Sequence, residues 1–188
     1  MTSTDSTHTD SRNIRTGGPA DATAPALVDL PARDELVVDG RGDPDAGPFR
    51  LAVAALYSAR AALCPPGEAV DVPLEGSYWQ TGRRENFDLE DRENWEWQLV
   101  VPAPDGTGEP AGGRVWRRRA PAHTVAELLH RGAFADEGPS LQRLYRFVGE
   151  RGLAPAGPHV EVYLTDPRHT PDPELRTILR VPVRGVRE

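Results

Sequence analysis

The sequence predicts an α+β fold in which a strand–helix–strand–strand (βαββ) unit occurs twice. Short segments of alternating apolar and polar residues indicate strands. Two longer segments carry apolar residues at helical spacing, and glycine- or proline-rich turns separate the segments. The same order of segments occurs over roughly residues 35–102 and again over roughly 122–184.

The first half begins with a short strand at 35–40, which glycines close. A helix is predicted next, within 45–64. Asp45 is its candidate N-cap, and two prolines end it after Cys64. Strands are then predicted at 68–79 and at 94–102, where apolar residues alternate with polar ones.

The second half repeats this order, with a strand at 122–134, a helix at 138–153, and strands at 159–164 and 175–183. The two helices align on Val53, Leu56, Tyr57 and Arg60 in the first and on Leu141, Leu144, Tyr145 and Val148 in the second. An internal duplication is the simplest explanation. We expect a sheet with both helices on one face and a ligand on the other, partly uncovered face.

The 188 residues suffice for one domain with a core and are too few for two ordinary domains. Residues 1–27 are rich in Thr, Ser, Asp and Gly, so we expect a disordered tail before a single domain at 28–188. The net charge of −7 argues against a nucleic-acid-binding surface. The arginine triplet at 117–119 lies in a Gly/Pro-rich stretch, which is typical of a solvated loop.

Several classes of chemistry are disfavoured by composition. The single cysteine, Cys64, excludes an internal disulfide and a cysteine zinc cluster, and the absence of lysine excludes a P-loop and Schiff-base chemistry. No histidine pair has zinc spacing, and no nucleophile elbow supports a serine triad. No segment has the roughly 18 apolar residues of a membrane span, and the N-terminus lacks a signal-peptide core. We expect a soluble, cytoplasmic monomer without a metal or other cofactor, which binds neither nucleic acid nor membranes.

Glu161 is the first candidate functional residue, because it interrupts an otherwise apolar strand. Side chains alternate along a strand, so Glu161 shares a face with Tyr163. A carboxylate beside an aromatic ring suits a cavity wall, and the alternative is a solvent-exposed face. Glu75 is a second candidate, with binding of backbone amides in its own turn as the alternative. His130 can reach a ligand by the same alternation, and a structural role is its alternative.

The chain resembles the GyrI-like small-molecule-binding family over residues 31–184. The resemblance rests on the segments GRGDP, PLEGSYW, WEWQLVVPAP, HRGAFADE and ERGLAPAGPHVEVYLTDPRHTPDPELRTILRVPV. The most specific part is a Glu-x-Tyr-Leu-x-Asp-Pro strand end followed by Leu-x-Thr-x-Leu-Arg. The chain departs from longer members between the halves, where DGTGEPAGGRVWRRRAPA replaces what is usually a charged helix.

The resemblance implies a duplicated βαββ fold with a concave groove between the halves, which takes up flat, hydrophobic and often cationic molecules. A subfamily of similar length, the cyclopropanoid cyclopropyl hydrolases, opens the cyclopropane ring of duocarmycin- and yatakemycin-type natural products within an aromatic cage. Other members only bind drugs, or form the sensing part of transcription regulators.

Aromatic residues are the expected lining of such a groove, because their faces stack on planar rings and attract positive charge. With the resemblance in view, the candidates are Tyr57, Trp79, Trp95, Trp97, Phe134 and Tyr163, together with Glu75 and His130. Phe134 stands where family members usually carry tyrosine. Packing in the core is the alternative; it stays open for Trp95 and is preferred for Tyr145 and Phe147, which have helical spacing.

The resemblance leads us to expect a hydrolase that adds water to the cyclopropane ring of duocarmycin- or yatakemycin-type compounds. Such an enzyme must hold a flat ligand, direct a water at the ring and stabilise charge on the carbonyl oxygen. We expect Glu161 to orient or deprotonate the water, and a donor such as Tyr57 or a water in the groove to stabilise the charge on that oxygen. One alternative is a non-catalytic protein that sequesters flat hydrophobic or cationic molecules. Another is a protein that acts on a macromolecule, which would need an exposed apolar patch.

Overall fold

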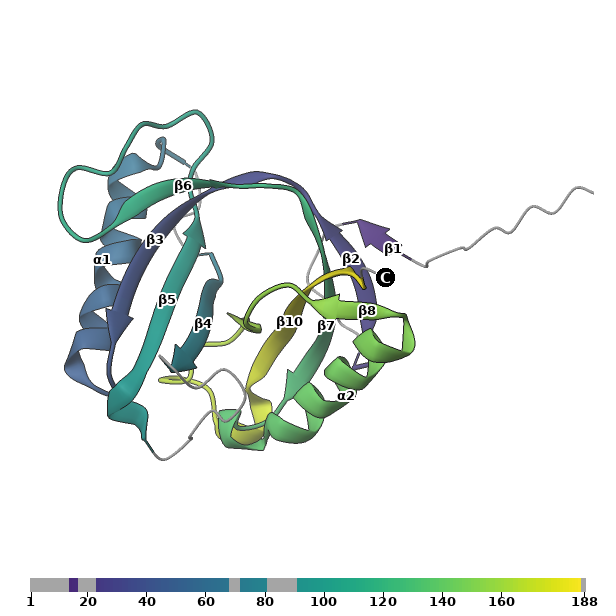
Figure 1. Ribbon diagram of the computed structural model, residues 1–188. Helices are drawn as coiled ribbons and strands as arrows, with labels where there is room; N and C mark the ends of the chain where they lie inside the picture. Colours follow the sequence, from purple (N-terminus) through teal and green to yellow (C-terminus); the bar gives the residue numbers. More distant parts are fainter. Residues whose placement is uncertain (1–13, 17–22, 68–71, 81–90, 187–188) are drawn as a thin grey trace, which may run out of the picture.

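The described residues, 14–16, 23–67, 72–80 and 91–186, form one curled sheet with two helices on its outer side in the computed structural model (Figure 1). The strands are β1 (Ile14–Thr16), β2 (Ala26–Leu30), β3 (Arg33–Arg41), β4 (Leu74–Gln80), β5 (Trp95–Pro102), β6 (Trp116–Ala120), β7 (His123–Arg131), β8 (Leu153–Pro155), β9 (Val160–Tyr163) and β10 (Arg176–Gly185). The helices are α1 (Gly47–Leu63) and α2 (Gly138–Glu150), with short 3-10 helices η1 (Arg92–Asn94), η2 (Phe134–Asp136) and η3 (Asp172–Glu174). The predicted α+β fold with two βαββ units is confirmed, because β3-α1-β4-β5 and β7-α2-β9-β10 repeat the same order.

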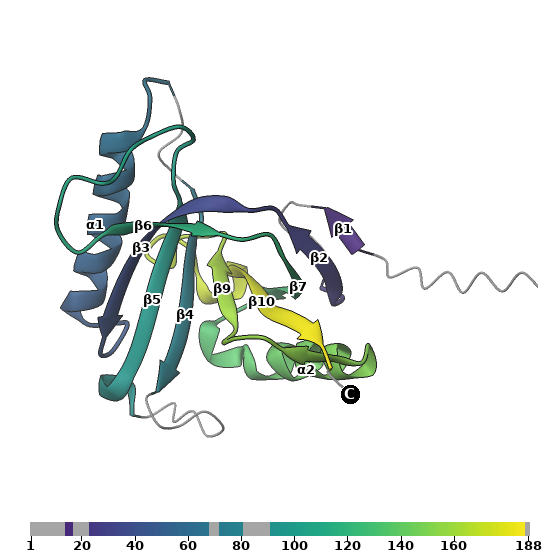
Figure 2. The ribbon, with the colours of Figure 1, turned by 45° about the horizontal axis from the view of Figure 1, so that its top comes forward.

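The two units meet at the centre of the sheet. The strand order is β1-β2-β7-β10-β9-β4-β5-β3-β6, so β4 of the first unit pairs with β9 of the second. The outer strands are exchanged between the units. β2 precedes β3 but pairs with β7, and β6 precedes β7 but pairs with β3. The connected β2–β3 and β6–β7 segments therefore cross from one half of the sheet to the other (Figure 2).

Each helix covers the core of its own unit. α1 packs on a cluster that includes Leu36, Leu56 and Leu99, and α2 packs on one that includes Leu128 and Leu144. Both clusters lie on the same face of the sheet, since paired residues in neighbouring strands share a face. Burial of these apolar side chains is the main force that fixes the helices there.

Trp97 is the largest fully buried side chain among the described residues, and Gly40 makes room for it. Gly40 lies opposite Trp97 in the β3–β5 pair. A Cβ atom on Gly40 would come within 2.0 Å of the indole ring. The indole nitrogen donates to the carbonyl of Gly42 at 3.1 Å, which satisfies its one donor inside the core.

Part of the predicted tail at 1–27 is described: it contains β1 and the first residues of β2, while its residues 1–13 and 17–22 lie outside the described part. Three other local predictions are corrected. The helix α1 starts at Gly47, and its N-cap is Ala46 rather than Asp45. No side chain forms a capping hydrogen bond there. The strand predicted at 68–79 is described only from residue 72 and is assigned from Leu74 to Gln80.

The arginine triplet at 117–119 is the third correction, because it forms most of strand β6 instead of a loop. Arg117 and Arg119 bind the carboxylate of Asp34, and Arg118 binds Glu35. Acidic residues of β3 thus neutralise the basic strand beside them, a partnership that the local sequence does not show. None of the described helices is long and apolar enough to cross a membrane.

Candidate active site

Glu161 lies at the middle of the sheet, between the two helices. One row of directly paired side chains starts in the core under α1 and ends in the core under α2: Val38, Leu99, Gly76, Glu161, Leu179 and Leu128. The helices pack mainly on the strands to either side of the centre, α1 on β3 and β5 and α2 on β7, β8 and β10, and leave β4 and β9 between them. The candidate site is therefore on the helix-bearing face, whereas we expected the ligand on the opposite face.

A hydrogen-bonded chain of two tyrosines ends on the Glu161 carboxylate. The hydroxyl of Tyr163 donates to Oε2 of Glu161 at 2.7 Å, and the hydroxyls of Tyr78 and Tyr163 lie 2.6 Å apart. Because Tyr163 uses its one proton on Glu161, Tyr78 must donate to Tyr163. The other carboxylate oxygen lies 3.3 Å from Nε2 of His159. With 14% of its side chain exposed, Glu161 is held in place yet open to a small molecule.

Both tyrosines stay protonated over the whole working range of pH. Burial raises the pKa of Tyr78 far above its ordinary value, and the neighbouring charge of Glu161 raises it further. Burial likewise raises the pKa of Tyr163, with Tyr78 and Glu161 adding to the effect. The chain Tyr78–Tyr163–Glu161 is therefore a permanent donor network that orients one carboxylate.

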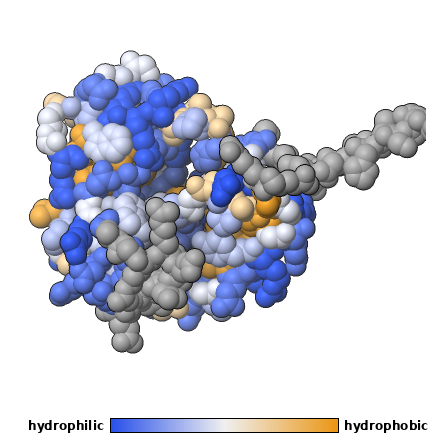
Figure 3. Space-filling view, in the orientation of Figure 1, coloured by the Kyte–Doolittle hydropathy of each residue, from blue (hydrophilic) through white to orange (hydrophobic). Residues whose placement is uncertain are grey.

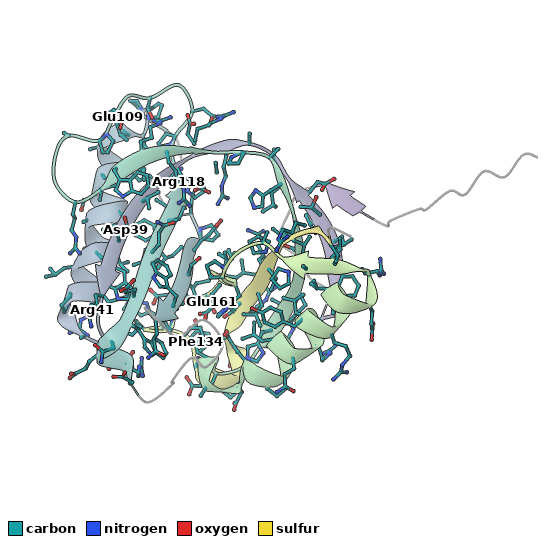
Figure 4. The ribbon with its side chains drawn as sticks, viewed as in Figure 1. Asp39, Arg41, Glu109, Arg118, Phe134 and Glu161 are labelled. Carbon is teal, nitrogen blue, oxygen red and sulfur yellow. The ribbon has the colours of Figure 1, made fainter. Side chains whose placement is uncertain are left out.

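Aromatic rings from both halves of the molecule pack against the two tyrosines that hold this carboxylate. Trp95 contacts Tyr78 edge to face, with ring centroids 6.1 Å apart, and Phe134 contacts Tyr163 in the same way at 5.5 Å. Phe49 of α1 stacks on Tyr78 at 6.5 Å. Figure 4 shows Phe134 and Glu161 close together in the space between the two halves. The arrangement offers flat apolar surfaces around one negative charge, which suits a planar molecule with a polar or cationic group.

A second carboxyl group, that of Glu137, lies in the same site. It directly precedes α2 and is only 5% exposed. Its Oε1 atom is buried without a hydrogen-bond partner, as is Oγ1 of Thr177. Burial raises the pKa of Glu137 to about 9, and the nearby charge of Glu161 contributes to the rise. The site therefore holds one neutral carboxylic acid close to a carboxylate that accepts hydrogen bonds.

Three aromatic candidates are placed elsewhere. Trp97 lies in the core under α1 with 1% of its surface exposed, so it is a packing residue. Trp79 points to the inner face of the curled sheet, opposite the helices, where its indole nitrogen donates to Glu96 at 2.6 Å. The hydroxyl of Tyr57 donates to the backbone carbonyl of Val72 at 2.6 Å. Its proton is thus committed, which removes Tyr57 as the donor that we expected.

Glu75 and His130 have structural partners. Glu75 lies on the inner face with Arg33 at 2.6 Å and Arg180 at 3.7 Å, because it is one residue out of phase with Gly76. Arg118, on the same inner side, is labelled in Figure 4. His130 is on the helix-bearing face, but its ring nitrogens lie 3.0 Å from the Ser140 hydroxyl and 3.1 Å from the Ala133 carbonyl. It fixes the start of α2, the structural alternative considered above.

The structure thus brings together Glu161, Tyr163, Phe134 and Trp95 of the predicted set, and adds Tyr78, Glu137, Thr177 and Phe49. Tyr78 was open to prediction, because it alternates with Trp79 and one of the two had to face the helices. Glu137 carried no such signal, since an acidic residue at a helix start is ordinary. Among the described residues, no three His, Cys, Asp or Glu side chains are grouped as a metal ion would require.

The family model of the GyrI-like small molecule binding domain matches residues 24–184. The chain belongs to this family. The resemblance noted in the sequence is thereby confirmed at the level of the family, and small-molecule binding is its general function. A comparison with the curated proteins gave no match.

Solved structures of this GyrI-like fold include proteins from Listeria innocua. Two are hydrolases, each with a TM-score of 0.72: one is 26% identical over 88% of this chain and 94% of that chain, and the other is 27% identical over 87% and 93%. An uncharacterized conserved protein from the same organism is 28% identical, with a TM-score of 0.75 over 88% and 94%. The C-terminal domain of EcmrR, at 14% identity and a TM-score of 0.63 over 86% and 98%, shares the fold.

Proposed function

We propose that this GyrI-like protein is a hydrolase that opens the cyclopropane ring of duocarmycin- or yatakemycin-type alkylating compounds by adding water. The observation that carries the proposal is the placement of Glu161, which is fixed by Tyr163 in the middle of an aromatic site. The similarity to two Listeria hydrolases along most of the chain supports an enzyme rather than a binder alone. We propose that the protein acts as a cytoplasmic monomer that detoxifies such compounds.

The proposed reaction requires the protein mainly to position the ligand and a water and to accept a proton. The ligand is a cyclopropane joined through a spiro carbon to a cyclohexadienone, so breaking the bond at that carbon converts the dienone to an aromatic phenolate and is favourable. Trp95, Tyr78, Tyr163 and Phe134 would hold the flat ligand with its methylene carbon above Glu161. The carboxylate then orients a water and accepts its proton as the new carbon–oxygen bond forms. The tyrosine chain keeps that carboxylate aimed at the water.

A surface for a macromolecular partner has less support. The large hydrophobic side chains that are exposed in the described part are Leu51, Trp116, Phe134, Tyr145 and Val186, and they lie on different elements. On the face shown in Figure 3, hydrophilic residues predominate and hydrophobic ones show only in small patches. A single larger patch would be expected for a protein partner.

The proposal is tested with the purified protein and a duocarmycin-type cyclopropane compound, followed by mass spectrometry. We expect a product heavier by one water, formed faster than in buffer and over many turnovers. Glu161→Gln should lower kcat by about 100-fold or more, since Gln cannot accept the proton. Glu174→Gln, which removes an exposed carboxylate on η3, is the matched control and should leave the rate unchanged.

The outcomes separate an enzyme from a binding protein. Trp95 lies in the site, so the tryptophan emission reports binding independently of turnover. A ligand that quenches this emission and leaves unchanged in mass would identify a protein that sequesters the compound. Equal rates for Glu161→Gln and wild type would show that Glu161 is not the base.

A further inference from the structure

Glu137 is a buried acid that the sequence pattern does not mark as functional. Its neighbours on the same segment, Asp136 and Gly138, are exposed, whereas its own side chain is 5% exposed and turned into the protein. Its Oε1 atom has no hydrogen-bond partner. Buried polar atoms are paired in the great majority of cases, so an unpaired carboxyl oxygen needs an explanation. Contact between this carboxyl group and a bound ligand would explain the unpaired oxygen.

The position of Glu137 relative to Glu161 is set by the sheet. Tyr163 pairs with Thr177, and Thr177 pairs with His130, so these three side chains form one row on the helix-bearing face. His130 lies within hydrogen-bond distance of Ala133 and Ser140, which flank Glu137, so it fixes the turn that carries Glu137 at the end of this row. Three residues before Glu137, Phe134 contacts the ring of Tyr163. Glu137 is therefore at the α2 side of the aromatic site, beside the Tyr163–Glu161 pair.

The charges around Glu137 favour its protonated form. Glu161 of β9 is close enough for its charge to act on Glu137, and the charge of Glu137 in turn acts on Tyr78 of β4. The tyrosines remain neutral, and the charge of Glu161 opposes a second negative charge. Burial is the largest cause, so the pKa of Glu137 is raised to about 9. At neutral pH this group can donate a proton.

We propose that Glu137 is the acid that protonates the carbonyl oxygen of the ligand while Glu161 takes the proton of the attacking water. This role rests on the proposed ring-opening hydrolysis and completes it, because the hydroxyl of Tyr57 is bonded to Val72 and does not fill it. A neutral acid and a carboxylate in one site divide the work of acid and base, as environments that separate two titrating groups do in other enzymes.

The step balances with these two groups alone. The water oxygen forms a bond to the cyclopropane methylene carbon, and the carbon–carbon bond between that methylene and the spiro carbon breaks. The electron pair of the broken bond moves into the dienone and onto its oxygen, which takes the proton of Glu137. Glu161 receives the proton that the water loses. Proton transfer from Glu161 to Glu137, directly or through solvent, restores both groups, so one water is consumed for each ring opened.

Glu137→Gln tests the role, because Gln has the same shape and can donate a hydrogen bond but no proton. We expect kcat to fall by about 100-fold or more, in the range of general acid catalysis, while the Kd from tryptophan quenching changes by less than about threefold. Glu150→Gln, which changes an exposed carboxylate at the far end of α2, is the matched control and should retain the wild-type rate. Circular dichroism of each variant checks that the fold is kept.

The wild-type pH profile is a second test that needs no variant. The rate should fall as the pH rises through about 9, because Glu137 loses the proton that it must donate. The residual activity of Glu137→Gln should lack this fall. A group that only supports the fold would not give the wild type such a limb and remove it from the variant.

Each outcome bears on a different claim. If the wild type does not turn the compound over, both the proposed hydrolysis and the role of Glu137 in it are overturned. If the wild type is active and Glu137→Gln is equally fast, or retains the decline near pH 9, hydrolysis stands and the acid is another group. A loss of kcat with an unchanged Kd and a flattened pH profile supports Glu137 as the acid.

Discussion

Because Gly76 has no side chain, the hydroxyls of Tyr78 and Tyr163 can lie close to the backbone of β4. A Cβ atom at this position would lie 2.8 Å from the Tyr78 hydroxyl and 3.2 Å from the Tyr163 hydroxyl, inside normal contact distance. Gly76→Ala should therefore displace the two hydroxyls and weaken their hold on Glu161. We expect kcat for the cyclopropane compound to fall by about tenfold or more, since catalytic geometry tolerates little displacement. Steady-state kinetics measures this effect.

Gly108→Ala is the control for that substitution, because nothing lies within 4 Å of a Cβ atom there and the residue is exposed. It should leave the kinetics unchanged. If Gly76→Ala is as active as wild type, then the Tyr78–Tyr163 chain is not needed to position Glu161.

Alternation along residues 159–164 predicts that Glu161 and Tyr163 share a face of the sheet, but it cannot identify the side chain that binds them. Their partner, Tyr78, comes from a strand more than eighty residues earlier in the chain.

At the scale of elements, the curled sheet separates two kinds of charge. The outer face carries the site, while the inner face carries ion pairs between strands. On the inner face Arg180 of β10 binds the fully buried Glu127 of β7 at 2.9 Å and approaches Glu75 of β4. The local sequence pattern correctly predicts that side chains alternate between the two faces of each of these strands. It does not say which face receives the helices, because that depends on the other strands. Alternation alone therefore could not show that Glu75 and Trp79 lie on the inner face while Glu161 and Tyr163 lie on the helix-bearing face.

Arg180→Met should destabilise the protein strongly, because it leaves the Glu127 carboxylate buried without its cation. Breaking a buried pair in this way typically costs about 3–5 kcal/mol. Replacing both partners, as in Glu127→Leu with Arg180→Leu, should recover most of that loss, since no charge then stays unpaired. Urea unfolding gives the free energies of unfolding for all three proteins.

Arg168→Met provides the comparison, because Arg168 pairs with Asp166 in an exposed turn. Surface pairs contribute little, so its unfolding midpoint should match that of wild type. A double variant that is less stable than Arg180→Met would show that the inner-face pair stabilises the sheet by itself.

At the scale of the molecule, the exchange of β2 and β6 joins the two units into one folding unit. All four tryptophans, Trp79, Trp95, Trp97 and Trp116, lie on β4, β5 and β6, which belong to the first half of the sheet. Circular dichroism instead reports strands and helices of both halves. If each unit unfolded alone, the two signals would give different midpoints in urea. Because β2 and β6 each bridge the halves, we expect the two curves to coincide.

Leu27→Ala provides a stringent test of whether the two halves unfold together. Leu27 is 2% exposed, belongs to β2 and packs in the cluster under α2, on the side of the molecule that has no tryptophan. Losing a buried leucine side chain costs about 2–5 kcal/mol. We expect the tryptophan-monitored midpoint to fall as far as the one monitored by circular dichroism. A tryptophan curve that does not move would show that the halves unfold separately. Coupled unfolding would also mean that the candidate site exists only when the whole sheet is folded. The site takes Trp95 and Tyr78 from one half and Phe134, Glu137 and Glu161 from the other.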